Sequence, residues 1–161
     1  MKNLEKVKQG KKNKRDGAKF ELLVRKDLES KGWIVDKWTN NVECIKYNKE
    51  TSRDPEDWGE CKLIPAKHKF CGIGRPMSLG TGFPDFIAFR RWINESFVGD
   101  RSRLESVMTI LCECIGVEVK SNGYLDKTER EKCKWLLENN IFSKILIASK
   151  DGKEIKYEEF K

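Results

Sequence analysis

Two apolar runs near the middle of the chain read Gly82-Phe83-Pro84-Asp85-Phe86-Ile87-Ala88-Phe89 and Leu111-Cys112-Glu113-Cys114-Ile115-Gly116-Val117-Glu118-Val119-Lys120. Both patterns are typical of buried strands. Each run nevertheless carries a carboxylate, Asp85 in the first and Glu118 in the second, and Lys120 follows directly. Burying a carboxylate is costly unless it is paired or holds a metal. We therefore expect the functional site to lie within residues 80–121.

The composition is that of one globular domain. The chain has 161 residues, of which 37% are charged and 38% hydrophobic, so it is long enough to bury a substantial core. No apolar run is long enough to span a membrane, and the start, Met-Lys-Asn-Leu-Glu-Lys, has no apolar signal region. We expect an intracellular, cytoplasmic protein with no membrane partner.

The net charge of +7 favours a polyanionic partner, above all nucleic acid. Basic residues crowd the N-terminus against one acidic residue, Glu5, before Asp16. We predict a basic, disordered arm at 1–15 that binds phosphate; the alternative is a tail that only aids solubility. The residues expected to contact nucleic acid are Lys11, Lys12, Lys14, Arg15, Lys19, Arg75 and Lys127.

Six cysteines without a secretory signal favour free thiols over a disulfide framework. Cys112, Cys114 and Cys133 fall in apolar patterns and are expected to act as small core residues. A structural zinc site is the alternative for a second set, although that set contains no Cys-x-x-Cys pair. Its members are Cys44, Cys61, His68 and Cys71.

Residues 16–161 are predicted to form a single domain. A helix capped by Asp16 runs to about Lys31, and strands follow at 33–38 and 42–47. We expect a long insertion at about 42–81, because the periodicity fails from Asn48 to Gly82 and glycines become frequent.

Beyond the insertion, the pattern predicts strands at 84–90, 108–120, 144–149 and 154–157. The polar segment 91–106 is interpreted as a hairpin excursion or a short helix, with a turn at Gly99-Asp100. Asp126 and Glu129 have capping-box spacing at the start of a helix that ends near Asn139. The order of elements predicts an α/β fold with a central mixed β-sheet flanked by helices.

The tripeptide Glu-x-Lys occurs five times in the chain, so context must decide which copy matters. Only Glu118-Val119-Lys120 ends a strongly apolar strand and follows another that carries Asp85. Residues two apart on a strand share a face and lie about 6.6 Å apart, so Glu118 and Lys120 point the same way. If the two strands are neighbours, the carboxylate of Asp85 meets that of Glu118.

Two carboxylates and the carbonyl oxygen of Val119 make a hard oxygen site suited to Mg²⁺, with Mn²⁺ as a substitute. Such a metal polarises a phosphodiester and lowers the pKa of a bound water. Lys120 is expected to orient that water or to neutralise charge on phosphorus. Glu21, on the core-facing stripe of the first helix, is the expected further ligand. The alternative is a buried cluster of ion pairs without catalysis.

Three segments together resemble a known family. Gly17-Ala18-Lys19-Phe20-Glu21, Gly82 to Ala88 and Val117-Glu118-Val119-Lys120-Ser121 are similar, in order and context, to the motifs of the PD-(D/E)xK nuclease superfamily. The likeness is greatest to archaeal Holliday-junction resolvases and virus-type replication-repair nucleases. Relatives often carry a glutamine in the helix after Ser121, where this chain has Lys127-Thr128-Glu129-Arg130.

The resemblance implies a restriction-endonuclease-like αβββαβ core and hydrolysis of DNA with Mg²⁺ or Mn²⁺. It assigns Asp85 and Glu118 as metal ligands, Lys120 as the catalytic lysine and Glu21 as the helix carboxylate. It also makes a homodimer and a branched DNA substrate, such as a four-way junction, reasonable expectations. Two alternatives remain: a catalytically inactive DNA-binding protein of the same fold, and an RNA-binding or zinc-stabilised interaction module.

Overall fold

The computed structural model describes residues 2–46, 58–67, 82–98, 105–152 and 154–161. Two helices and seven strands follow one another along this part of the chain. They are α1 (Lys2–Ser30), β1 (Ile34–Lys37), β2 (Asn40–Lys46), β3 (Trp58–Pro65), β4 (Phe86–Val98), β5 (Glu105–Val119), α2 (Lys127–Glu138), β6 (Lys144–Asp151) and β7 (Glu154–Glu159). Of these helices, neither has the length and apolar character needed to cross a lipid bilayer.

The central sheet has five strands in the order β1-β4-β5-β6-β7. β5 lies in the middle, antiparallel to β4 and parallel to β6, while β1 and β7 pair antiparallel with β4 and β6. α2 makes the crossover between the parallel strands β5 and β6, as such connections require. β2 and β3 form a separate two-stranded sheet. The predicted α/β fold with a mixed sheet is therefore confirmed.

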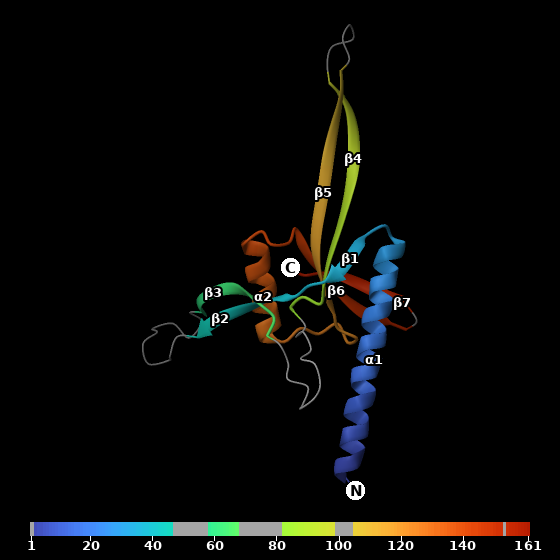
Figure 1. Cartoon of the computed structure of the whole chain (residues 1–161), viewed down its shortest axis with the longest axis vertical. Helices are drawn as coiled ribbons and strands as arrows, with labels where there is room; N and C mark the ends of the chain where they lie inside the picture. Colours follow the sequence, from blue (N-terminus) through green and yellow to red (C-terminus); the bar gives the residue numbers. More distant parts are fainter. Residues whose placement is uncertain (1, 47–57, 68–81, 99–104, 153) are drawn as a thin grey trace, which may run out of the picture.

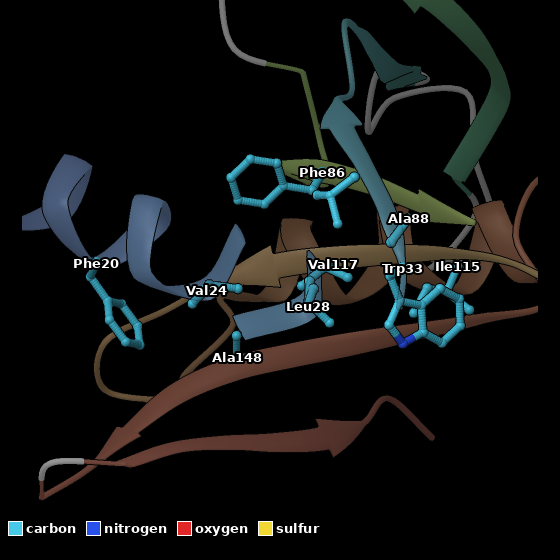
Figure 2. Packing of buried hydrophobic residues seen from close by; sticks show 10 residues of the cluster. Phe20, Val24, Leu28, Trp33, Phe86, Ala88, Ile115, Val117 and Ala148 are labelled. Atoms are coloured by element: carbon cyan, nitrogen blue, oxygen red, sulfur yellow. The ribbon is translucent and has the colours of Figure 1, made fainter. Parts of the chain in front are cut away.

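The sheet buries apolar side chains on both faces, and Figure 1 shows α1 and α2 on opposite sides of it. On one face, α1 contributes Phe20, Val24 and Leu28 to a core that includes Ile115 and Val117 of β5 (Figure 2). On the other, α2 supplies a second core with buried residues of β6 and its neighbours. The members include Cys133, Leu136, Phe142, Ile145 and Ile147.

The first helix differs from the prediction. We expected it to begin at Asp16, after a disordered arm, but α1 is continuous from Lys2. Residues 2–15 contain no proline and are rich in lysine, a good helix former, so the helix propagates outward from the half that packs on the sheet. This N-terminal half extends away from the sheet (Figure 1), and residues 5–15 are exposed.

Strand β3 was not predicted. It lies inside the expected insertion, where Gly59, Glu60 and Lys62 interrupt any apolar alternation. Residues 47–57 and 68–81 of the insertion, with Arg75, His68 and Cys71, lie outside the described residues.

The polar segment 91–106 belongs to a hairpin, as the first of the two alternatives predicted, because β4 extends to Val98 and β5 begins at Glu105. The predicted turn at Gly99-Asp100 lies outside the described part of the chain. β1 pairs with β4 only up to Phe89, and β6 pairs with β5 only from Ile115. Residues 90–98 and 105–114 therefore pair only with each other, and we call them the β4–β5 arm. Figure 1 shows the arm projecting from the sheet, opposite to the N-terminal half of α1.

The expectation of free thiols was wrong for one pair. Cys44 and Cys61 are directly opposite each other on β2 and β3 and form a disulfide, with 4.0 Å between their Cα atoms. Two of the four residues considered for zinc are thereby committed to a bond with each other. Because disulfides are typical of oxidising compartments, this one gives no support to a cytoplasmic location. Cys133 is buried and Cys114 half-buried, as expected, but Cys112 is exposed because it lies on the arm.

Candidate active site

The two predicted carboxylates meet where β4 begins and β5 ends. Phe86 pairs with Val117, so Asp85, just before β4, lies beside Glu118. The side chain of Glu118 accepts the backbone N–H of Asp85 through Oε2 at 3.1 Å. The side chain of Asp85 accepts the backbone N–H of Val119 through Oδ2 at 3.0 Å. The pairing of two strands thus fixes both carboxylates at one end of the sheet.

Two glycines permit this arrangement because each lets another group approach closely. A Cβ at Gly116 would lie 2.9 Å from Cγ of Pro84 and 3.1 Å from the ring of Phe142, so only glycine leaves room for the cis Phe83–Pro84 segment against β5. A Cβ at Gly82 would lie 2.3 Å from the carbonyl oxygen of Trp38. The absence of a side chain at Gly82 therefore lets the segment that precedes Asp85 pack directly against the backbone that follows β1.

Lys120 follows β5 and lies on the same side as Glu118. Its Nζ is 3.2 Å from Oε1 of Glu118 and also donates to Oε1 of Glu129, at the start of α2. Burial alone would lower the pKa of Lys120, but the hydrogen bonds and charges of Glu129 and Glu118 outweigh it and raise that pKa. Lys120 is therefore a charged ammonium group in this site.

Glu129 is a site residue that the sequence reasoning assigned only to helix capping. The capping box is confirmed: Asp126 Oδ1 accepts the N–H of Glu129 at 2.8 Å, and Glu129 Oε2 accepts the N–H of Asp126 at 3.0 Å. The other oxygen of Glu129 binds Lys120. The capping box itself was the available signal, since it placed a carboxylate in the first turn of the helix that follows β5.

Glu21 lies near the pair but does not contact it. Its Oε2 is 2.5 Å from Nζ of Lys37, the last residue of β1, and Lys37 pairs with Phe86 next to Asp85. The charge of Glu21 contributes to the raised pKa of Asp85, so the two carboxylates interact electrostatically. Lys37 was not selected from the sequence, because only the register of β1 on β4 brings it here.

Burial dominates the electrostatics of the pair. Glu118 is only 5% exposed, and desolvation, followed by the charge of Asp85, raises its pKa to about 8. Desolvation also raises the pKa of Asp85, against the opposing hydrogen bond from Val119. A cation that contacts both carboxyl groups would offset their mutual repulsion and stabilise their ionised forms.

The donor set fits one divalent cation held mainly by solvent and two carboxylates. Mg²⁺ usually keeps several waters and takes one or two carboxylates from the protein, with substrate phosphates completing its shell. Among the described residues, Oδ1 of Asp85 carries no hydrogen bond, and no group of three or more His, Cys, Asp or Glu side chains is assembled for a metal. Asp85 and Glu118 are thus the ligands that fit, while Glu21 is held by Lys37. The backbone group of Val119 that contacts the pair is its N–H, which donates to Asp85 and is not a metal ligand.

The residues expected to contact nucleic acid lie mostly on one element. Lys11, Lys12, Lys14, Arg15 and Lys19 are exposed on α1, within the helix that also carries Glu21. Lys127 is exposed at the start of α2, two residues before Glu129. The basic half of α1 and the first turn of α2 therefore present positive charge on the two helices that carry Glu21 and Glu129.

Comparison with protein-family models, with curated proteins and with solved structures found no match to this chain.

Proposed function

We propose that the chain is a metal-dependent endonuclease that hydrolyses phosphodiester bonds in DNA. The observation that carries the proposal is the meeting of Asp85, Glu118 and Lys120 at the ends of two paired strands. A buried carboxylate pair beside a charged lysine is a poor stabilising device, because desolvation offsets the attraction. It is, in contrast, the arrangement that phosphodiester hydrolysis needs.

Asp85 and Glu118 would hold Mg²⁺ or Mn²⁺. When bound, the metal would polarise the scissile phosphate and lower the pKa of a water molecule. Lys120 is charged, so it donates a hydrogen bond and cannot take a proton. Its role is to orient the attacking water or to offset the negative charge that develops on the phosphoryl oxygens. Glu129 contacts the ammonium group of Lys120 from one side, and Glu118 contacts it from the other. These two contacts limit the positions that Nζ of Lys120 can take.

The topology supports the same proposal. When the β2–β3 hairpin is set aside as an insertion, the first elements run α1-β1-β4-β5-α2-β6, the αβββαβ order implied by the resemblance to PD-(D/E)xK nucleases. Lys11, Lys12, Lys14 and Arg15 on α1 offer sequence-independent contacts to the phosphate backbone. The substrate class we propose is double-stranded DNA, with four-way junctions as the branched form to be tested first.

The test is cleavage of supercoiled plasmid, linear duplex, a flap and a four-way junction, with Mg²⁺ or with EDTA. We expect metal-dependent cutting that Asp85→Asn and Lys120→Met each reduce by about 10²-fold or more. Glu113→Gln, which removes a carboxylate from the opposite face of β5, is the matched control and keeps the activity. Absence of metal-dependent cutting of every substrate by the unmutated protein would overturn the proposal.

A catalytically inactive DNA-binding protein is the second candidate. It is favoured by the ion pairs Glu21–Lys37 and Lys120–Glu129, which satisfy these charges without a metal. DNA binding that is retained in EDTA and in Asp85→Asn, without cleavage under any condition, would identify this case.

A further inference from the structure

The connection between β5 and α2 carries the most exposed aromatic side chain among the described residues. Tyr124 is 64% exposed, and its hydroxyl makes no hydrogen bond within the described part of the chain. The hydroxyl of Tyr157, in contrast, donates to Oδ2 of Asp27 at 2.7 Å. Both the ring and the hydroxyl of Tyr124 are therefore open to a ligand.

The residues around Tyr124 hold the connection in place. Gly123 has a φ of +70°, which glycine adopts without strain, and the N–H of Tyr124 donates to Oδ1 of Asn122 at 3.2 Å. On the other side, Leu125 is buried in the second core, and its carbonyl oxygen accepts Nε of Arg130 at 3.3 Å. Because its neighbours anchor the backbone, the side chain of Tyr124 is not needed for packing and is presented in a fixed position.

The same connection joins two residues of the candidate active site. Lys120 follows β5, Glu129 lies in the first turn of α2, and an ion pair links their side chains. The N–H of Gly123 also donates to the carbonyl oxygen of Lys120 at 2.8 Å. Since four residues span at most about 14 Å, the Cα atoms of Lys120 and Tyr124 are no farther apart than that. Tyr124 is therefore within reach of a DNA strand held at the carboxylate pair.

Basic side chains follow Tyr124 on α2. Lys127 and Arg130 are exposed and lie three residues apart, on one face of the helix. The two carboxylates of the same stretch are engaged, because Asp126 caps α2 and Glu129 pairs with the lysine that follows β5. Proteins bind unpaired nucleotides with this combination, in which cations contact phosphates while an aromatic ring stacks on a base.

We propose that Tyr124 stacks on the exposed face of a DNA base close to the cleaved phosphodiester bond, an inference that rests on the proposed endonuclease function. In a continuous duplex each base is covered by its neighbours, so the ring finds no partner there. A base face is free where a nucleotide is unpaired or where strands branch. Tyr124 is thus the residue that favours DNA with such a break in stacking over a continuous duplex.

The position of the base follows from the length of the connection. Stacked bases lie about 3.4 Å apart along a strand, so a span of about 14 Å places the base within about four nucleotides of the phosphate at the metal site.

Affinity for two DNA duplexes of one sequence, one fully paired and one with a single-stranded flap, tests the proposal. Fluorescence anisotropy in EDTA measures binding without cleavage. We expect Tyr124→Ala to weaken binding to the flap about five- to a hundredfold, the range for one base stacked on an aromatic ring, and to leave binding to the paired duplex unchanged. Tyr124→Phe keeps the ring and should bind both as the unmutated protein does, whereas Tyr124→Leu should resemble Tyr124→Ala.

A four-way junction with fully paired arms distinguishes the two sources of a free base face. Loss of affinity on the flap alone assigns an unpaired nucleotide to Tyr124, and loss on both assigns the branch point.

Two further variants separate stacking from other contacts. Lys127→Gln removes a phosphate contact, so it should weaken binding to both duplexes to the same extent. Trp92→Ala removes an aromatic ring that is 40% exposed on the β4–β5 arm, and it should change neither affinity. Circular dichroism checks that each variant is folded.

A direct readout places 2-aminopurine at successive positions of the flap, because the fluorescence of this base falls when it stacks. We expect one position to lose fluorescence on binding the unmutated protein or Tyr124→Phe, but not Tyr124→Ala. Equal losses of affinity on paired and flapped DNA, unchanged binding by Tyr124→Ala, or no binding of either DNA would overturn the proposal. These measurements need no metal, so an absence of cleavage would overturn the proposed function alone.

Discussion

Asp85 and Glu118 hold each other through the backbone: Glu118 accepts the N–H of Asp85 at 3.1 Å, and Asp85 accepts the N–H of the residue after Glu118 at 3.0 Å. The two side chains are thereby fixed even though their charges repel. This fixed pair explains why the pKa of Glu118 rises to about 8, since burial and the charge of Asp85 both disfavour its ionised form.

The raised pKa of Glu118 gives stability a pH dependence of known sign. In the unfolded chain Glu118 releases its proton near its ordinary pKa of 4.5, whereas the folded protein keeps it to about pH 8. Its contribution is therefore fully present below about pH 4.5 and lost as pH rises to about 8. Glu118→Gln removes this loss, so in EDTA the variant should gain thermal stability relative to the unmutated protein as pH rises through this window.

Glu113→Gln is the control, because the contribution of Glu113 to stability changes with pH in the opposite direction to that of Glu118. Hydrogen bonds from Lys144 lower the pKa of Glu113, so its contribution is present at neutral pH and lost on acidification. Unfolding curves of the Glu118→Gln and unmutated proteins that stay parallel across the pH range would contradict the assigned environment of Glu118.

Glu129 has two separable roles, capping α2 and anchoring Lys120. Glu129→Gln keeps an oxygen for the capping box but loses the charge, so we expect little change in stability and about a tenfold loss of DNA cleavage, comparable to one hydrogen bond to a charged group. Asp126→Ala removes the cap but leaves the ion pair between Glu129 and Lys120. It should therefore lower stability by about 1 kcal/mol and leave DNA cleavage unchanged. Identical profiles for the two variants would show that Glu129 acts through the helix alone.

Gly116 is required because Pro84 and Phe142 occupy the space that a side chain would need. Gly116→Ala should lower the free energy of unfolding by about 1–3 kcal/mol, as overpacking does, and reduce cleavage by displacing the Pro84-Asp85 segment. Gly17→Ala is the matched control: a Cβ at this position of α1 would meet no atom within 4 Å apart from the helix's own backbone, so alanine should stabilise by up to about 1 kcal/mol. Denaturant titrations of both variants measure the difference, and an unchanged midpoint for Gly116→Ala would refute the close approach.

The basic half of α1 should govern the salt dependence of DNA binding. Replacing Lys11, Lys12, Lys14 and Arg15 with glutamine should reduce the slope of log affinity against log salt by about 0.9 for each phosphate that the variant no longer neutralises. Lys134→Gln and Lys156→Gln, on α2 and β7, serve as controls and should leave the slope nearly unchanged. Fluorescence anisotropy over a range of salt gives the slopes, and equal slopes for all variants would mean that α1 does not contact DNA.

Much of the site could be predicted from the strand patterns together with the family resemblance. Asp85 and Glu118 stand in apolar runs and Lys120 follows the second, so their meeting was predicted on the condition that the two strands are neighbours, and the pairing of β4 with β5 meets that condition. The partners of two site residues were not, because Glu21–Lys37 and Lys120–Glu129 depend on the strand register and on where α2 begins. The disulfide was missed with β3, whose residues lack alternation. The helical state of the basic segment was missed because its charge pattern carries no packed face.

The central claim is that Asp85 and Glu118 together bind a divalent cation, and Mn²⁺ tests it most directly because its paramagnetic resonance signal distinguishes free from bound ion. Titration at about pH 8, where about half of the Glu118 carboxyl groups are ionised, should reveal Mn²⁺ binding that Asp85→Asn and Glu118→Gln each weaken at least about tenfold, while Glu113→Gln binds as the unmutated protein does. Equal affinity in all four proteins, or no binding by the unmutated one, would contradict the account.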